Sequence, residues 1–267
     1  MAHKRVQDIC KLCGKPGQLC KSHYLSKVLH TLSRTGGENP VVMTPELIKI
    51  SPRQVWAHLL CSLCERRFND RGEKLVLKLF NGANGFPLLE RMNLARPVRV
   101  EPTVITYSGS GMGIETESLA YYALSVLWKG SVHKWKTVRH QSTSISLGKY
   151  QEPIRRYLLD QAGFPDGVYV IVAVCTDSGS QGMNFAPCEV AQSKLPMYSL
   201  LVRGLWFHVL TTGENPPGLS ELCCIRSAKK VIFKEDCTKR FLEAGRHIHK
   251  TATVSTELRS SPSALRT

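Results

Sequence analysis

Four cysteines in two pairs are the residues of this sequence whose spacing most directly indicates chemistry. Cys10 and Cys13 form one Cys-x2-Cys pair, and Cys61 and Cys64 form a second pair after an interval of 47 residues. Two such pairs supply the four thiolates of a tetrahedral structural zinc site. Gly14, directly after the first pair, favours the tight turn of a zinc-binding knuckle. The sequence therefore predicts bound Zn2+; four free buried thiols are the alternative.

The elements around these pairs must bring them together. Residues 18–23 are expected to form a short strand that ends at His23, and residues 55–60 a second strand that leads into Cys61. A helix is expected over residues 62–80; Gly72 weakens its middle by about 1 kcal/mol relative to alanine, which leaves a kink or an early stop there as the alternative. Together these elements would make a β-β-α unit that a zinc ion holds together, with the strand-end histidine facing the first turns of the helix.

The charge of the chain favours a polyanionic partner. There are 36 Lys and Arg against 21 Asp and Glu, which gives a net charge of +15. Residues 1–80 alone carry 14 basic and 6 acidic side chains. We therefore expect nucleic acid as the partner, DNA ahead of RNA, with plain solubility as the alternative explanation.

The sequence predicts a cytoplasmic protein without a membrane partner. No apolar leader follows the polar start of the chain, and the apolar run at residues 168–175 is too short to cross a bilayer. The metal-type spacing of four of the ten cysteines fits a reducing compartment better than a disulfide scaffold.

Two segments carry a resemblance to a known family. Lys21-Ser-His-Tyr-Leu-Ser-Lys27 and Leu59-Leu-Cys-x2-Cys-Glu65, together with the cysteine pairs, resemble the HNH (ββα-metal) endonucleases, and in particular their zinc-framed members. The resemblance covers roughly residues 8–80. It implies a zinc-bound treble-clef domain and hydrolysis of phosphodiester bonds in DNA or RNA. Because HNH-like domains occur in phage-defence proteins, that setting is a further expectation by analogy.

The resemblance also implies roles for individual residues. His23 matches the family's general base, and a neutral imidazole suits that task at pH 7. Glu65 and Asn69 match the family's metal-ligand positions on the helix, and Glu73 continues the same face. Their oxygen atoms would hold Mg2+ or Mn2+, which would stabilise the leaving 3′-oxygen.

Two positions depart from the family pattern and keep a second function open. Ser22 stands where the family has a metal ligand before the base, and Trp56 stands where it has an asparagine that orients the base; His58 is close to that position. His23 could also be a capping or core histidine, and Glu65 could simply offset the helix dipole. The alternative function is a catalytically inactive zinc module that binds nucleic acid or a protein partner, and a homodimer is left open.

Basic side chains near the predicted site and in residues 128–140 are candidate phosphate contacts. In the second segment, basic residues are interleaved with Trp128 and Trp135, a mixture that suits phosphate contacts combined with base stacking. The candidate nucleic-acid contacts are Arg66, Arg67, Arg71, Lys134, Lys136 and Arg139.

The predicted fold class is α+β. Residues 1–100 are expected to form the zinc-framed HNH-like domain, residues 101–250 a mixed α/β domain of unknown role, and residues 251–267 an unstructured tail. In the second domain we expect an apolar helix at residues 117–129, a central strand at 168–175 and a hairpin that turns at Arg203-Gly204. Pro87, Pro97 and Pro102 predict an irregular link between the two domains.

Overall fold

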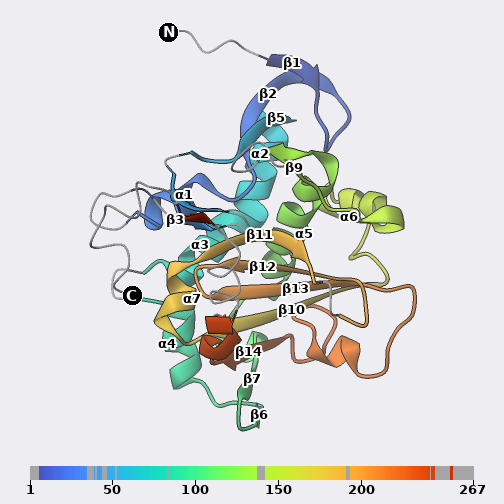
Figure 1. The fold of residues 1–267 in the computed structure, drawn as a ribbon. Coiled ribbons are helices and arrows are strands. Elements are labelled where there is room, and N and C mark those ends of the chain that lie inside the picture. Colours follow the sequence, from blue (N-terminus) through green and yellow to red (C-terminus); the bar gives the residue numbers. More distant parts are fainter. Residues whose placement is uncertain are drawn as a thin grey trace.

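The computed structural model describes residues 6–34, 39, 41–43, 47–51, 53–82, 85–136, 142–190, 193–240, 242–243 and 253–254. Over these residues the fold is α+β, as the sequence predicts. Figure 1 shows a small sheet at the end of the molecule that carries the N-terminus and a large sheet at the opposite end, with helices between and around them.

The small sheet is antiparallel and contains the predicted strands. Its order is β1 (Val6–Ile9), β2 (Pro16–His23) and β5 (Trp56–Cys61). In the β2–β5 pair, Lys21 lies opposite His58 and His23 lies opposite Trp56. Both expected strands are confirmed, with β2 beginning two residues earlier than expected.

The segment between β2 and β5 forms a helix and a second small sheet. These elements are α1 (Lys27–Leu32), β3 (Val41–Met43) and β4 (Leu47–Ile50), and β4 also pairs with β15 (Thr253–Val254). Two residues of the expected unstructured tail therefore belong to a sheet. The rest of that tail lies outside the described residues.

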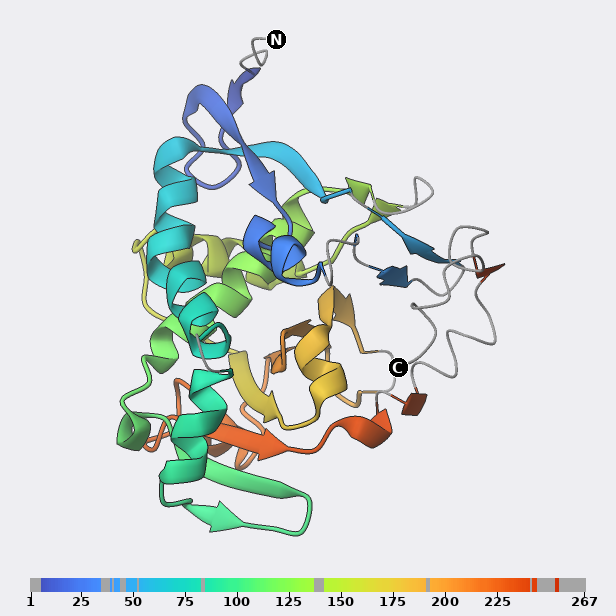
Figure 2. The ribbon, with the colours of Figure 1, turned by 90° about the vertical axis from the view of Figure 1, so that its left-hand side faces the viewer.

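The predicted helix over residues 62–80 is continuous but contains a π-helical turn. It consists of α2 (Ser62–Phe68), the π-turn η1 (Asn69–Glu73) and α3 (Lys74–Phe80), and it runs down one side of the molecule from the small sheet (Figure 2). A Cβ at Gly72 would lie 3.0 Å from the Cα of Tyr122 in α5 (Thr116–Val132). Gly72 thus allows two helix backbones to approach closely, which explains a residue that helix propensity disfavours.

Helix α5 joins the two predicted domains through one core. Most of its side chains are buried, and the Phe68 ring from α2 stacks edge-on against Tyr121 and Trp128 at 6.1 and 6.3 Å between centroids. A single hydrophobic cluster extends from Cys10 in the first predicted domain to Ile232 in the second. The two regions therefore pack against each other without a solvated gap at this helix.

The large sheet is mixed, with the order β11-β12-β13-β10-β14-β7-β6. Its strands are β6 (Arg99–Val100), β7 (Val104–Ser108), β10 (Val168–Cys175), β11 (Asn184–Glu189), β12 (Met197–Val202), β13 (Leu205–Thr211) and β14 (Val231–Glu235). The expected central strand is confirmed as β10, which pairs antiparallel with β13 and parallel with β14. The expected hairpin is confirmed as β12–β13, and its turn residues Arg203 and Gly204 have φ of 49° and 84°, as a type I′ turn requires.

The expected irregular link before residue 102 is wrong, because it contains α4 (Pro87–Leu94) and β6. Pro87 occupies the first turn of α4, where a missing N–H costs nothing, and Leu88 and Met92 are buried one turn apart. The remaining elements are η2 (Ser110–Met112), β8 (Trp135–Lys136), β9 (Ser142–Thr143), η4 (Gly148–Tyr150), α6 (Gln151–Leu158), α7 (Ser178–Gly182) and η5 (Leu219–Leu222). No helix among the described residues is long and apolar enough to cross a membrane.

Candidate metal centre and adjoining site

The structure brings the four predicted zinc cysteines together. The Sγ atoms of Cys10, Cys13, Cys61 and Cys64 all lie within 4.8 Å of one another, and those of Cys13 and Cys61 are 4.0 Å apart. Zn–S bonds of about 2.3 Å place tetrahedral thiolates about 3.8 Å apart. The donor set and its spacing therefore fit a metal ion such as Zn2+.

Backbone geometry holds the cysteine cluster in place. Gly14 has φ of +72°, and its N–H donates to the carbonyl of Cys10 at 2.9 Å, which closes the knuckle between β1 and β2. The N–H of Cys61 donates to the Cys10 sulfur at 3.3 Å. A hydrogen bond from Cys64, together with backbone donors, lowers the pKa of Cys10 to about 4, whereas the same bond and burial raise the pKa of Cys64.

A cation from the second predicted domain reaches the knuckle. Arg155 of α6 donates from Nη1 to the carbonyl of Leu12 at 2.6 Å, and its guanidinium also interacts with Glu152 and with Cys13. Four thiolates around one divalent ion leave a net charge of −2. Arg155 is placed to offset part of that charge.

His23 is held at the end of β2 by contacts that the sequence did not predict. Its imidazole has a hydrogen bond with the side chain of Gln54, and its carbonyl accepts from Nζ of Lys129 at 2.7 Å. Burial, and after it the charges of Lys129 and Lys27, lower the pKa of His23 below its usual 6.5. The imidazole is therefore neutral at pH 7. Gln54, two residues before Trp56, is thus the side chain that restrains the orientation of the imidazole.

Ser22 is a structural residue on the side of β2 that faces the helix. It is fully buried, its hydroxyl accepts from the N–H of Leu60 at 3.2 Å, and it also hydrogen-bonds to the Glu65 carboxyl. Because successive strand residues point to opposite faces, Ser22 and not His23 lies against Glu65. The family's ligand position therefore holds a residue that anchors β2 to β5 and α2.

Lys129 provides the positive charge beside the predicted carboxylates. It is buried in α5, and the charges of Glu65 and Glu73 raise its pKa against a larger lowering by burial. Burial raises the pKa of Glu65, an effect that Lys129 and Ser22 partly offset, and its Oε1 has no hydrogen-bond partner among the described residues. Glu73 accepts from the hydroxyl of Ser26 at 2.7 Å.

These residues do not form a ready site for Mg2+ or Mn2+. Among the described residues, only two groups of three or more His, Cys, Asp or Glu side chains converge within 4.8 Å, and neither contains His23, Glu65 or Glu73. The buried ammonium of Lys129 beside the two carboxylates opposes a second cation there. Asn69 is half-buried on the same helix between them.

The predicted phosphate contacts have different surroundings. Arg67 and Arg71 both pair with Asp160, and Arg71 also lies over the Tyr121 ring. Arg66, Lys134 and Lys136 are exposed, whereas Arg139 lies outside the described residues. The expectation of base stacking in residues 128–140 is wrong for both tryptophans. Trp128 and Trp135 are each 1% exposed, because Trp128 packs into the core from α5 and Trp135 stacks on the buried ring of Tyr24.

A basic and aromatic surface on the small sheet was not predicted. We call Lys21, His23, Trp56 and His58 the β2–β5 face, because opposite residues of an antiparallel pair share a face. Trp56 is 43% exposed, the Nζ of Lys21 lies 4.6 Å from its ring centroid, and the His58 ring meets it edge-on at 5.5 Å. In the sequence these residues stand at alternating positions, Lys21 and His23 in one strand and Trp56 and His58 in the other. Only the register of the β2–β5 pair shows that the four side chains share one face.

Comparison of the chain with protein-family models, curated proteins and solved structures finds no match.

Proposed function

We propose that this chain is a zinc-stabilised protein that binds a single-stranded segment of nucleic acid on the β2–β5 face. The observation that carries the proposal is the exposed ring of Trp56 with the Lys21 ammonium 4.6 Å from its centroid. An exposed indole is a stacking platform for an unpaired base, and an adjacent lysine suits the phosphate. The net charge of +15 supports the same class of partner.

The zinc would act structurally in this function. The order of knuckle, β2–β5 pair and helix, with cysteine pairs in the knuckle and at the start of α2, supports a treble-clef arrangement. Cys61 ends β5 directly before α2, and Leu59 accepts a backbone hydrogen bond from Lys11 at 2.9 Å. A metal in the cluster would therefore fix the register on which the β2–β5 face depends.

Replacing Trp56 with alanine is expected to weaken binding of a single-stranded oligonucleotide by about 5- to 150-fold, since stacking contributes about 1–3 kcal/mol per base. Lys21→Ala should lower the slope of log K against log[salt] by about one unit. Fluorescence anisotropy titrations with labelled DNA and RNA oligonucleotides at several salt concentrations measure both effects.

Leu63→Ala is the matched control, because Leu63 is 72% exposed on α2 and does not belong to the β2–β5 face. Equal losses for Trp56→Ala and Leu63→Ala, or binding by the unaltered protein that does not depend on salt, would contradict the proposal. Duplex DNA in the same titrations shows whether the preference is for unpaired bases.

A second candidate function is phosphodiester hydrolysis with His23 as the general base. The observation that favours it is the hydrogen bond between Gln54 and a half-buried, neutral imidazole. A neutral imidazole that is held in orientation can accept a proton from an attacking water. Since Glu65 and Glu73 lie beside Lys129, we derive no step through a divalent ion at these residues.

The hydrolase candidate predicts cleavage of DNA or RNA that falls by about 10²- to 10⁴-fold on His23→Ala. Gel assays with Mg2+, with Mn2+ and with neither ion measure it. His30→Ala, a half-buried histidine on α1, is the control. Absence of cleavage by the unaltered protein, or equal cleavage by the His23→Ala variant, removes this candidate, whereas nucleic-acid binding is decided by its own titrations.

A further inference from the structure

A second cluster of metal-ligand residues lies at one edge of the large sheet. Strands β10 and β14 are parallel neighbours, so their carboxyl ends meet at the same edge. Cys175 ends β10, Glu235 ends β14, and Cys237 follows two residues later. Ligand sites in sheets with parallel strands commonly form just beyond these ends.

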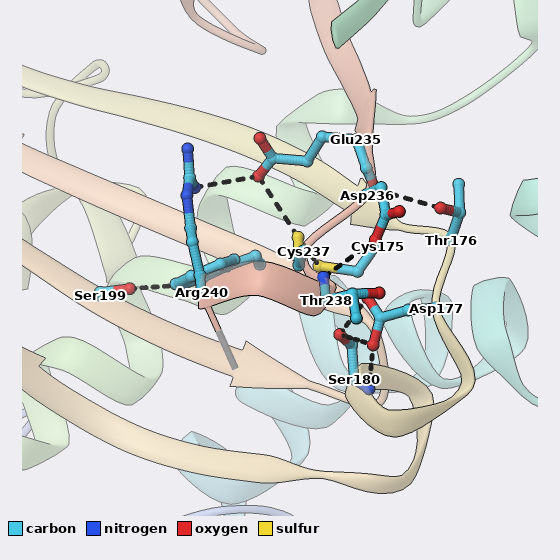
Figure 3. A network of polar contacts seen from close by, with 11 residues as sticks. Cys175, Thr176, Asp177, Ser180, Ser199, Glu235, Asp236, Cys237, Thr238 and Arg240 are labelled. Carbon is cyan, nitrogen blue, oxygen red and sulfur yellow. Dashed lines mark hydrogen bonds and ion pairs between the residues drawn. The ribbon is translucent and has the colours of Figure 1, made fainter. Parts of the chain in front are cut away.

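The side chains at this edge point toward one another. The Sγ atoms of Cys175 and Cys237 are 2.7 Å apart, and a carboxylate oxygen of Asp177 lies within 4.8 Å of both (Figure 3). Oε1 of Glu235 lies 3.6 Å from the Cys237 sulfur. Three donors, from Cys175, Asp177 and Cys237, therefore converge, and Glu235 adds a carboxylate beside Cys237; the four residues come from two segments of the chain, 175–177 and 235–237.

The surroundings of the cluster resemble an outer coordination shell. Asp177 accepts from the backbone N–H of Ser180 at 2.7 Å and from its hydroxyl, which fixes the carboxylate (Figure 3). Arg240 donates to Glu235 at 3.4 Å and offers a positive charge next to four potential anions. Partners of this kind orient metal ligands and tune their charge.

We propose that Cys175, Asp177 and Cys237 form a second metal site that binds Zn2+, with Glu235 as the fourth donor. Two thiolates select a borderline-soft ion such as zinc over Mg2+ or Ca2+, which prefer oxygen ligands alone. Tetrahedral Zn–S bonds require sulfurs about 3.8 Å apart, so the two cysteine side chains must rotate apart by about 1 Å on binding.

Simple packing is the competing explanation for the two cysteines. Both are fully buried in a small apolar cluster with Leu201, on the face of the sheet opposite to α5, and free cysteines often serve as small apolar residues. Packing accounts for the two thiols. It does not account for a carboxylate oxygen of Asp177 within 4.8 Å of both sulfurs, nor for Oε1 of Glu235 at 3.6 Å from the sulfur of Cys237.

Zinc content per chain tests the proposal. Native mass spectrometry of the full chain, purified with zinc and a reductant, is expected to show two bound ions, and Cys237→Ser should retain one. Asp177→Asn keeps a good helix N-cap at α7, so it should fold while lowering affinity for the second ion by at least about 10- to 100-fold, the loss that even outer-shell changes cause. Cys188→Ser, on the edge strand β11 of the same sheet and outside the proposed site, is the control.

Two further measurements distinguish this site from other arrangements. After exchange with ¹¹³Cd, the proposal predicts two separate NMR signals, one from four sulfur donors and one from two sulfurs with oxygen donors. A single bound ion with free thiols at Cys175 and Cys237 would overturn the proposal. So would a disulfide between them, seen as a mass loss of about 2 Da without reductant. If Cys237→Ser does not fold, the Asp177→Asn titration and the cadmium spectrum still decide the result.

Discussion

Replacing Cys64 with serine is expected to remove one equivalent of bound zinc and to unfold the β1–α2 region. Cys64 is 4% exposed, and its Sγ atom belongs to the four-sulfur cluster at the start of α2. Apparent binding free energies of structural zinc are about 10–16 kcal/mol in small domains, so loss of the ion should cost about 5 kcal/mol or more of stability. Metal analysis together with thermal unfolding, with and without a chelator, measures both effects.

Cys20→Ser is the matched control for this prediction. Cys20 lies on β2, half-buried like Cys13 and Cys61, but it does not belong to the four-sulfur cluster. Its replacement should leave the zinc content unchanged. If Cys64→Ser and Cys20→Ser behave alike, or if a chelator leaves the unfolding temperature unaltered, the four cysteines are not a structural metal site.

The second large effect is expected at Lys129, the buried cation of α5. Lys129→Met keeps the apolar stem but leaves Glu65 and Glu73 without their nearby positive charge, and it also removes the bond to the His23 carbonyl. Removing one partner of a buried charge group typically costs about 3–5 kcal/mol, which corresponds to roughly 6–20 °C in Tm for a chain of this size. Differential scanning calorimetry measures the change.

A paired variant separates charge from packing at this site. Adding Glu65→Gln to Lys129→Met should restore part of the lost stability. The double variant no longer has a buried charge at position 65 that lacks a positive partner. Lys134→Met, at an exposed position just after α5, should change stability by less than about 0.5 kcal/mol. A Lys129→Met variant as stable as Lys134→Met would show that the ammonium does not compensate the two glutamates.

The cysteine cluster and its supporting strands could be predicted because their signals are local. Cys-x2-Cys spacing, Gly14 and the two expected strands at residues 18–23 and 55–60 are each visible within a few residues. Gln54 and Lys129 could not be predicted in the same way, since they reach His23 through tertiary contacts. Lys129 is separated from His23 by 106 residues and lies near the end of an apolar helix, so the sequence does not indicate which residues its charge contacts.

The same distinction applies to the fold. Strand β10 and the β12–β13 turn follow from a β-branched run and from an Arg-Gly pair, whereas α4 and β6 were missed because prolines suggested an irregular link. The first turn of a helix tolerates a proline such as Pro87, so a proline alone does not exclude a helix. Trp128 and Trp135 were considered for base stacking because basic residues are interleaved with them, but Trp128 belongs to the apolar helix expected at residues 117–129, and its side chain is buried with most of α5.

The π-helical turn at Asn69–Glu73 also sets the helical phase of the residues around it. In an uninterrupted α-helix, Glu65 and Glu73 would point about 80° apart, because eight residues advance the helix by about 800°. A π-turn accommodates about one extra residue per turn, which reduces the offset to roughly 20°. Both carboxylates can then face Lys129 at once. The alignment of the two acids depends on this single inserted residue, and removing it would rotate α3 and everything after it relative to the zinc cluster.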